Sequence, residues 1–207
     1  MIDLYTWTTP NGRKVSIALE EMNLDYEAHA IDIGKDDQFV PEFLAISPNN
    51  KIPAIRDRPT GFHLMESGAI LFWLAEKSGQ FLPEASKWEA MEWMMWQMAG
   101  FGPMLGQAHH FLKYNSGVSN YAEDRYRTEA ERLYSVLDKR LDGRDFMVGS
   151  YSIVDMAAWP WASRFEWHQI DLNAYPNVRD WYLRIADRPA VQKGYDVPKV
   201  TTPIPKP

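Results

Sequence analysis

The pattern of apolar and polar residues predicts strands alternating with helices over the first 79 residues, and almost only helices after them. Short apolar runs predict β-strands at residues 2–5, 26–33, 53–56 and 62–65. Helices are expected at residues 12–23, 41–46 and 67–77, the first because Val15, Leu19 and Met22 share one helical face. Residues 57–61 are rich in turn formers, so the last two strands should form an antiparallel hairpin and the order is βαβ, a short helix, then ββα.

The second part of the chain is expected to be an all-helical domain. A linker is predicted near residues 79–84, followed by helices at residues 87–110, 121–141, 153–167 and 175–187. The third of these begins at Ser152-Ile153-Val154-Asp155, a capping box with Asp in place of Glu, and Pro160 would kink it. We therefore predict an α/β domain over residues 1–80, a linker over 81–86, a helical domain over 87–196 and an extended Pro-rich tail over 197–207.

Charge and hydropathy exclude two classes of partner. The net charge is −6 and the basic residues are dispersed among acidic ones, so nucleic acid is not an expected partner. No apolar run approaches the roughly 20 residues that span a bilayer, so no membrane partner is expected either. Residues 1–3 begin a strand rather than a signal peptide, and the expected location is cytoplasmic.

The absence of cysteine limits the chemistry of the first domain. Its order of strands and helices resembles the thioredoxin-like domain of glutathione transferases. Because the chain has no cysteine, such a domain must either bind without reacting or activate a thiol that its ligand brings. Glutathione is a ligand of this kind, since it is a peptide with free carboxylates and one thiol.

Two short segments could hold a peptide ligand. Proline has cheap access to a cis bond, so Ile52-Pro53 could turn the main chain of Ile52 outward, where it could pair with a bound peptide. Glu66 and Ser67 stand at a predicted helix start, where a hydroxyl and free N–H groups favour a carboxylate. The plainer alternative is a proline at a strand start and a serine N-cap, both common in unrelated folds.

Thr9 and Asn11 are the candidates for activating a thiol. They lie in the loop between the first strand and the first helix, where Pro10 fixes a turn and Gly12 permits a close approach. Both side chains can donate a hydrogen bond to a sulfur anion. Lowering a thiol pKa by about two units takes roughly 2.7 kcal/mol, which two donors and a helix N-terminus could supply. Asn11 could instead simply cap the helix.

Five segments, in this order along the chain, resemble the nu-class glutathione transferases, which are bacterial relatives of the globular domain of a nitrogen-regulating prion protein. They are Thr9-Pro10-Asn11-Gly12, Gly34-Lys35-Asp36-Asp37-Gln38-Phe39, Ser47-Pro48-Asn49-Asn50-Lys51-Ile52-Pro53-Ala54-Ile55, Glu66-Ser67-Gly68-Ala69-Ile70 and Gly102-Pro103-Met104-Leu105-Gly106-Gln107. The resemblance covers nearly the whole chain. It implies the glutathione transferase fold, glutathione as cosubstrate, disulfide reduction as the activity and a homodimer.

The same resemblance implies roles for individual residues. Thr9 and Asn11 would be catalytic, and glutathione would contact Asn11, Gln38, Ile52, Glu66, Ser67 and Arg132. Pro53 would fix the main chain of Ile52, and Lys51 could add a positive charge, although Lys51 is as readily explained as a lysine free in solvent. A solvated helix face is the plain alternative for Arg132.

Other interpretations remain open. The same thiolate could attack carbon, which would make the activity conjugation of glutathione to an electrophile rather than reduction of a small disulfide. A non-enzyme alternative is a binding or regulatory module on a transferase scaffold. A metal is not expected, because His109 and His110 are helix neighbours without a third ligand. Tyr5 should pack in the core rather than act as a catalytic phenol.

Overall fold

The computed structural model describes residues 1–207 and divides them into two compact units. Unit 1 comprises Met1–Pro83 and Asp187–Ile204, and unit 2 comprises Glu84–Ala186 and Pro205–Pro207. The predicted ranges differ from this division, because they assigned residues 187–196 to the helical domain and treated residues 197–207 as a tail of their own.

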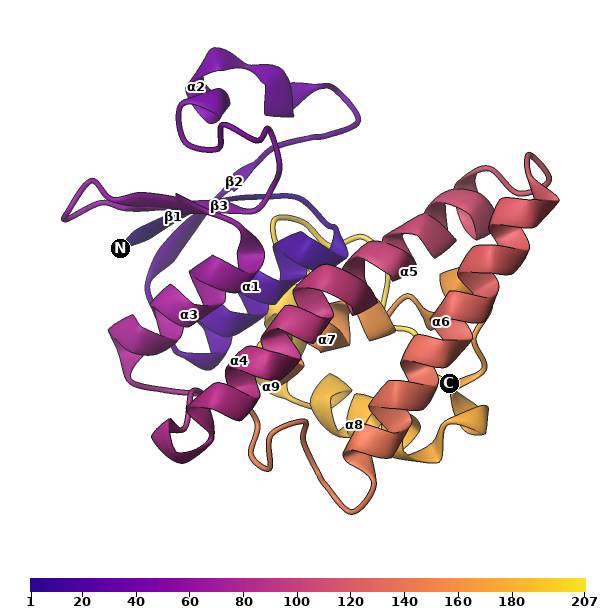
Figure 1. Ribbon diagram of the computed structural model, residues 1–207. Helices are drawn as coiled ribbons and strands as arrows, with labels where there is room; N and C mark the ends of the chain where they lie inside the picture. The colour runs from indigo at the N-terminus through magenta and orange to yellow at the C-terminus, as the bar shows by residue number, and fades with distance from the viewer. The chain divides into compact units, whose positions relative to one another are not determined.

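Unit 1 is built on a four-stranded mixed sheet in the order β2-β1-β3-β4. The strands are β1 (Ile2–Thr6), β2 (Tyr26–Ala30), β3 (Ala54–Asp57) and β4 (His63–Met65). β1 is parallel to β2 and antiparallel to β3, and β3 and β4 form the predicted antiparallel hairpin. Helices α1 (Pro10–Glu21) and α3 (Ser67–Ser78) lie on one side of the sheet and α2 (Pro41–Leu44) lies on the other (Figure 1).

Side chains of β1 alternate between the two faces of the sheet, as the period of a strand requires. Ile2, Leu4 and Thr6 are buried. Tyr5 points to the other face, where its ring stacks on His29 with centroids 4.9 Å apart and lies 6.3 Å from the ring of Phe43 in α2. These contacts agree with the expected packing role of Tyr5.

Helix α9 (Pro189–Tyr195), which the sequence did not predict, packs against α1 within unit 1. Ser16 Oγ donates to the carbonyl of Gly194 at 2.7 Å. A Cβ at Gly194 would come within 2.7 Å of the Ile17 Cα, so the two helices can approach this closely only at a glycine. Arg188 adds an ion pair to Glu21 with an N–O distance of 2.6 Å. These contacts explain why the segment from Asp187 belongs to unit 1.

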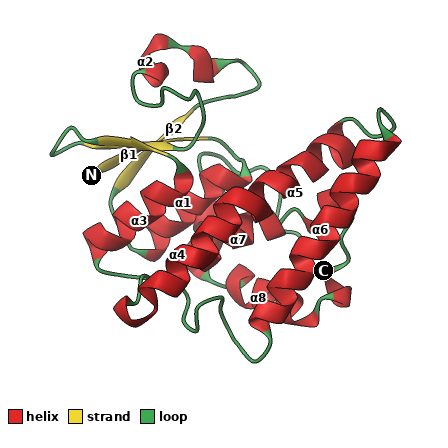
Figure 2. Cartoon of the chain, viewed as in Figure 1, coloured by secondary structure: helices red, strands yellow, loops and turns green.

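Unit 2 is helical, as predicted (Figure 2). Its α-helices are α4 (Lys87–Trp96), α5 (Gly102–Ala108), α6 (Asn120–Leu141), α7 (Ile153–Ala162) and α8 (Pro176–Ala186). The predicted helix over residues 87–110 contains two π-helical segments, Gln97–Phe101 and His109–Tyr114, and so runs four residues further. None of the helices combines the length and apolar composition needed to cross a bilayer.

The capping box at the start of α7 is confirmed. Ser152 Oγ accepts from the Val154 N–H, and Asp155 Oδ2 accepts from the Ser152 N–H at 3.0 Å. All ten residues of α7 are buried. The helix ends at Ala162, earlier than predicted, where Ser163 Oγ donates to the carbonyl of Pro160 and a short 3₁₀ segment follows.

Candidate functional site

The sheet brings four of the predicted segments to one edge. β3 is antiparallel to both of its neighbours, and Ala54 at its start pairs with Tyr5 near the end of β1 and with Met65 at the end of β4. β2 is parallel to β1, and Ala30 at its end pairs with Thr6. Four segments therefore lie at the same edge of the sheet. They are the segments that follow β1, β2 and β4 and the segment that precedes β3.

The loop after β1 places Thr9 at the N-cap of α1. Its Oγ1 accepts from the Gly12 N–H at 3.2 Å, and Pro10 takes the first helical position. Asn11 is therefore not the residue that caps the helix, which was the alternative to a catalytic role. Because Thr9 Oγ1 accepts from Gly12, its hydroxyl hydrogen is directed elsewhere and can be donated. Asn11 is half-buried in the first turn of α1, two residues after Thr9.

Gly12 allows the loop to fold back on the end of β1. A Cβ at this position would lie 2.2 Å from the carbonyl oxygen of Trp7 and 2.5 Å from Thr6 Oγ1. A side chain at residue 12 would thus push Thr9 and Asn11 out of place, which is the close approach that the sequence predicted.

The segment before β3 presents the main chain of Ile52 at the same edge. The peptide bond Ile52–Pro53 is cis, the isomer that the proline makes accessible. Ser47 Oγ donates to the carbonyl of Lys51 at 2.8 Å, and Asn50 has φ of 49°, so the turn before Ile52 is held by its own residues. Ile52 lies outside the ladders that pair β3 with β1 and β4, and its main chain is not used by the sheet. Pro53 is buried and Lys51 is exposed, which fits either interpretation of Lys51.

Helix α3 begins without a capping side chain. Glu66 is its N-cap residue but makes no side-chain cap hydrogen bond, and it adopts φ 71°, ψ 111°, a conformation that non-glycine residues rarely hold. Ser67 follows as the first helical residue and is 4% exposed. The N–H groups of the first turn and the Ser67 hydroxyl lie at the positive end of a 12-residue helix, an arrangement that favours a carboxylate.

Gln38 lies in a 3₁₀ turn (Asp37–Phe39) after β2. Its side-chain Oε1 is buried and has no hydrogen-bond partner in the chain. A buried acceptor in this state is unusual in a folded protein, and a ligand N–H is one group that would satisfy it.

Lys14 is the residue of this region that sequence reasoning missed. It lies on α1 one turn after Asn11, it is 1% exposed, and its Nζ is 3.4 Å from Ser67 Oγ. Burial lowers the pKa of Lys14 to about 7, and the charge of Glu66 opposes this shift. The spacing along the sequence could have pointed to this residue, because Lys14 lies three residues after Asn11 and four before Ala18, on the same helical face as both.

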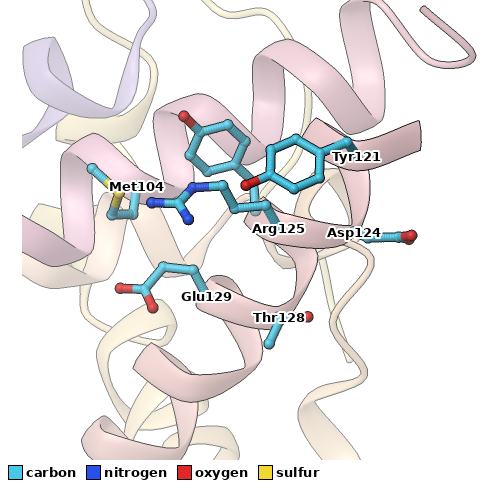
Figure 3. Close-up of a pocket in the computed structure, with 7 residues that line it drawn as sticks. Met104, Tyr121, Asp124, Arg125, Thr128 and Glu129 are labelled. Atoms are coloured by element: carbon cyan, nitrogen blue, oxygen red, sulfur yellow. The ribbon is translucent and has the colours of Figure 1, made fainter. Parts of the chain in front are cut away.

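Arg132 belongs to unit 2 and has a partner of its own there. It is exposed on α6, and its Nε and Nη2 donate to Glu129 at 2.8 Å and 2.7 Å. Glu129 in turn borders a pocket of about 600 Å³ within unit 2. Figure 3 shows Arg125 extending toward Met104 and Glu129 in this pocket, with Tyr121 nearby. The predicted contact of Arg132 with a ligand stays a prediction.

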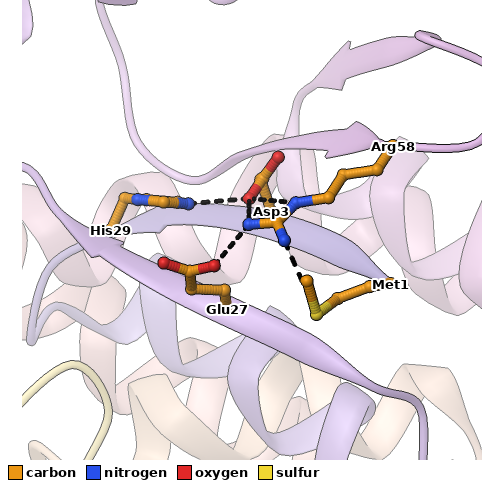
Figure 4. A network of polar contacts seen from close by, with 5 residues as sticks. All are labelled: Met1, Asp3, Glu27, His29 and Arg58. Atoms are coloured by element: carbon orange, nitrogen blue, oxygen red, sulfur yellow. Dashed lines mark hydrogen bonds and ion pairs between the residues drawn. The ribbon is translucent and has the colours of Figure 1, made fainter.

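A separate cluster of ionisable groups lies on the sheet of unit 1 (Figure 4). Asp3, Glu27 and His29 offer ligand atoms within 4.8 Å of one another, the spacing of a metal site. Arg58 lies among them and bonds to both carboxylates, with Nε 3.0 Å from Asp3 Oδ1. This guanidinium, followed by the His29 hydrogen bond, lowers the pKa of Asp3 to about 2 against the effect of burial. Arg58 thus supplies the positive charge that balances the two carboxylates.

His109 and His110 do not lie together. His109 is buried and its ring stacks on that of His168, with centroids 4.6 Å apart, whereas His110 contacts Asn115 at the surface. Burial, together with the charge of Arg164, lowers the pKa of His109 to about 3. The stacked rings of His109 and His168 are therefore both neutral near neutral pH.

Models of two protein domains match this chain, the glutathione S-transferase N-terminal domain over residues 8–77 and the glutathione S-transferase C-terminal domain over residues 98–189. Disulfide-bond oxidoreductase YfcG of Escherichia coli (strain K12) is 50% identical over 198 residues, which cover 92% of this chain and 92% of that protein.

Two solved structures are similar along nearly their whole length. A glutathione transferase from Pseudomonas putida, with one glutathione disulfide bound per subunit, has a TM-score of 0.90 and 44% identity and covers 95% of this chain and 91% of its own. A glutathione transferase from Burkholderia graminis, with two glutathione molecules bound per subunit, has a TM-score of 0.91 and 43% identity. The match covers 97% of this chain and 89% of that one.

Proposed function

This chain belongs to the glutathione S-transferase family, and we propose that it reduces disulfides with the thiolate of a bound glutathione. The main support is the combination of a cysteine-free chain with a single sheet edge that carries Thr9 and Asn11, the main chain of Ile52 outside the strand ladders, and a helix start without a side-chain cap. A relative at 50% identity that is named a disulfide-bond oxidoreductase supports the same reaction class.

Each part of the edge has a role in holding the tripeptide. The main-chain N–H and C=O of Ile52 pair with the peptide backbone of glutathione, in the manner of an added strand. The γ-glutamyl carboxylate binds Ser67 and the N-terminus of α3, beside Glu66. Gln38 Oε1 accepts an N–H from the ligand, and Lys51 adds a positive charge. Arg132 of unit 2 is a further proposed contact for a ligand carboxylate, which rests on the family resemblance alone.

Thr9 and Asn11 stabilise the sulfur anion. The Thr9 hydroxyl and the Asn11 amide donate to the sulfur, and the N-terminus of α1 adds the positive end of its dipole. Hydrogen bonds to a charged group contribute about 1.5–3 kcal/mol each, so these groups suffice to make most of the bound thiol ionised near neutral pH.

The reaction then proceeds by two exchanges that involve no protein atom covalently. The glutathione thiolate attacks one sulfur of the disulfide, forming a mixed disulfide and releasing the other half as a thiolate. A second glutathione thiolate attacks the glutathione sulfur of that mixed disulfide, which gives glutathione disulfide and the second product thiolate. Two thiols are oxidised and one disulfide is reduced, so electrons balance. The protein contributes position and charge stabilisation.

Assembly and location belong to the same proposal. We infer a homodimer from the family resemblance, and the exposed side chains of Trp88 and Met95, two turns apart on α4, are apolar surface that a partner subunit could cover. The proposed location is the cytoplasm, where reduced glutathione is available as a cosubstrate.

Glutathione-dependent reduction of 2-hydroxyethyl disulfide tests the function. The parent chain should catalyse it, and Ser67→Ala should raise the KM for glutathione about tenfold with a smaller effect on kcat, because Ser67 holds the ligand rather than the sulfur. The matched control is Ser135→Ala, a serine on α6 whose hydroxyl donates within its own helix.

Turnover of a chlorinated nitrobenzene separates the two reactions that a bound thiolate could perform. We expect the disulfide to be the better substrate. Strong conjugation with no disulfide reduction would reverse the assignment, and no turnover of either compound, together with no glutathione binding, would favour the non-enzyme alternative.

A further inference from the structure

A buried lysine lies behind the proposed carboxylate site. Lys14 is on the inner face of α1, and its side chain is 1% exposed, although lysine is rarely buried without a functional or structural reason. Its Nζ is 3.4 Å from Ser67 Oγ, so the ammonium group adjoins the hydroxyl that begins α3. The arrangement adds a positive charge to a helix N-terminus that has no capping side chain.

The other charged groups around α1 have different partners. Arg13 donates from Nε to the Tyr195 carbonyl at 3.0 Å and lies over the Tyr195 ring, facing α9. Lys193 of α9 pairs with Glu20, and Asp57 of β3 pairs with Lys77.

Glu66, at the start of α3, is a carboxylate whose charge acts on Lys14. It raises the pKa of Lys14, but burial lowers it more, and the result is about 7. An opposite charge that binds nearby raises a lysine pKa again. A carboxylate arriving at Ser67 would be such a charge.

We propose that Lys14 is a positioning residue of the glutathione site, which holds Ser67 toward the γ-glutamyl carboxylate and takes up a proton when that carboxylate binds. This inference rests on the proposed function. The proton comes from solvent and goes to Nζ, and no covalent bond changes. Glutathione binding therefore weakens as the pH rises from about 6 to about 8, because the uncharged amine must first be protonated.

Calorimetric titration with S-methylglutathione tests this coupling, since that ligand has no ionisable thiol. We expect the affinity of the parent relative to that of Lys14→Met to fall roughly tenfold between about pH 6 and about pH 8, if binding raises the lysine pKa by about two units. Titration of the ligand's own amine is common to both proteins and cancels in this ratio. Lys139→Met, an exposed lysine on α6, is the matched control and should behave as the parent.

A second readout measures the proton uptake directly, and its result for the parent does not depend on how any variant folds. At about pH 8 the heat of binding should change with the ionisation enthalpy of the buffer, in the direction of proton uptake, and Lys14→Gln should lose this dependence. Binding without proton uptake, or an affinity ratio that stays constant with pH, overturns the role of Lys14 but leaves the proposed function standing. No binding at any pH overturns the proposed function and this inference with it.

Discussion

Replacing Asn11 by alanine should lower kcat/KM for glutathione-dependent disulfide reduction about 10- to 100-fold, the value of one hydrogen bond to an anion. Asn11 lies in the first turn of α1 but does not cap it, because Thr9 Oγ1 already accepts from the Gly12 N–H. The substitution therefore removes the proposed donor to sulfur while the helix keeps its cap. Steady-state assays at several pH values measure the effect.

The pH profile separates a catalytic from a structural role. Loss of a thiolate donor should move the alkaline rise of kcat/KM to higher pH, toward the ordinary thiol pKa of about 8.5. Asn120→Ala, an exposed asparagine at the start of α6, is the control and should match the parent. Thr9→Ser should keep both the cap and the donor and thus most of the activity. Undiminished activity of Asn11→Ala would remove Asn11 from the mechanism.

Replacing Asp155 by alanine should lower the free energy of unfolding by about 3–5 kcal/mol, because it leaves several buried donors without an acceptor. Asp155 is fully buried and accepts from the Met147 N–H at 3.0 Å, from the Ser152 N–H at 3.0 Å and from Trp181 Nε1 at 2.8 Å. Burial raises the pKa of Asp155 to about 6, although these hydrogen bonds lower it. Urea unfolding monitored by tryptophan fluorescence measures the loss.

Asp171→Ala provides the comparison. Asp171 also caps a helical turn, by accepting from the Asn173 N–H at 2.9 Å, but it is exposed, so its loss should cost only about 1 kcal/mol or less. Equal effects of the two substitutions would show that the buried network around Asp155 adds nothing to an ordinary cap.

Much of unit 1 follows from local sequence signals. Turn formers between two short apolar runs predict a hairpin at residues 53–56 and 62–65, and its register brings the segments before β3 and after β4 to the same edge of the sheet. Strand ends differed by one to three residues, since pairing rather than composition ends a strand. The capping box of α7 is equally predictable, because its hydrogen bonds join residues only two or three apart in the sequence.

Features that depend on distant contacts were not predictable. Helix α9 begins at Pro189 and is only seven residues long, and its place on α1 depends on a close approach at Gly194. The burial of Lys14 does not follow from the sequence, because lysine on an amphipathic helix is usually solvated and only the packing of α3 shows that it is buried. The π-helical segments of the long helix leave no recognised pattern in composition.

Ultraviolet absorbance of the thiolate, followed as bound glutathione is titrated with base, tests the central claim most directly. The chain contains no cysteine, so every thiolate signal from the complex belongs to the ligand. We predict that the bound thiol ionises with a pKa of about 6.5, roughly two units below the ordinary value, and that Asn11→Ala shifts it upward. A bound thiol that titrates as it does free in solution would contradict the account.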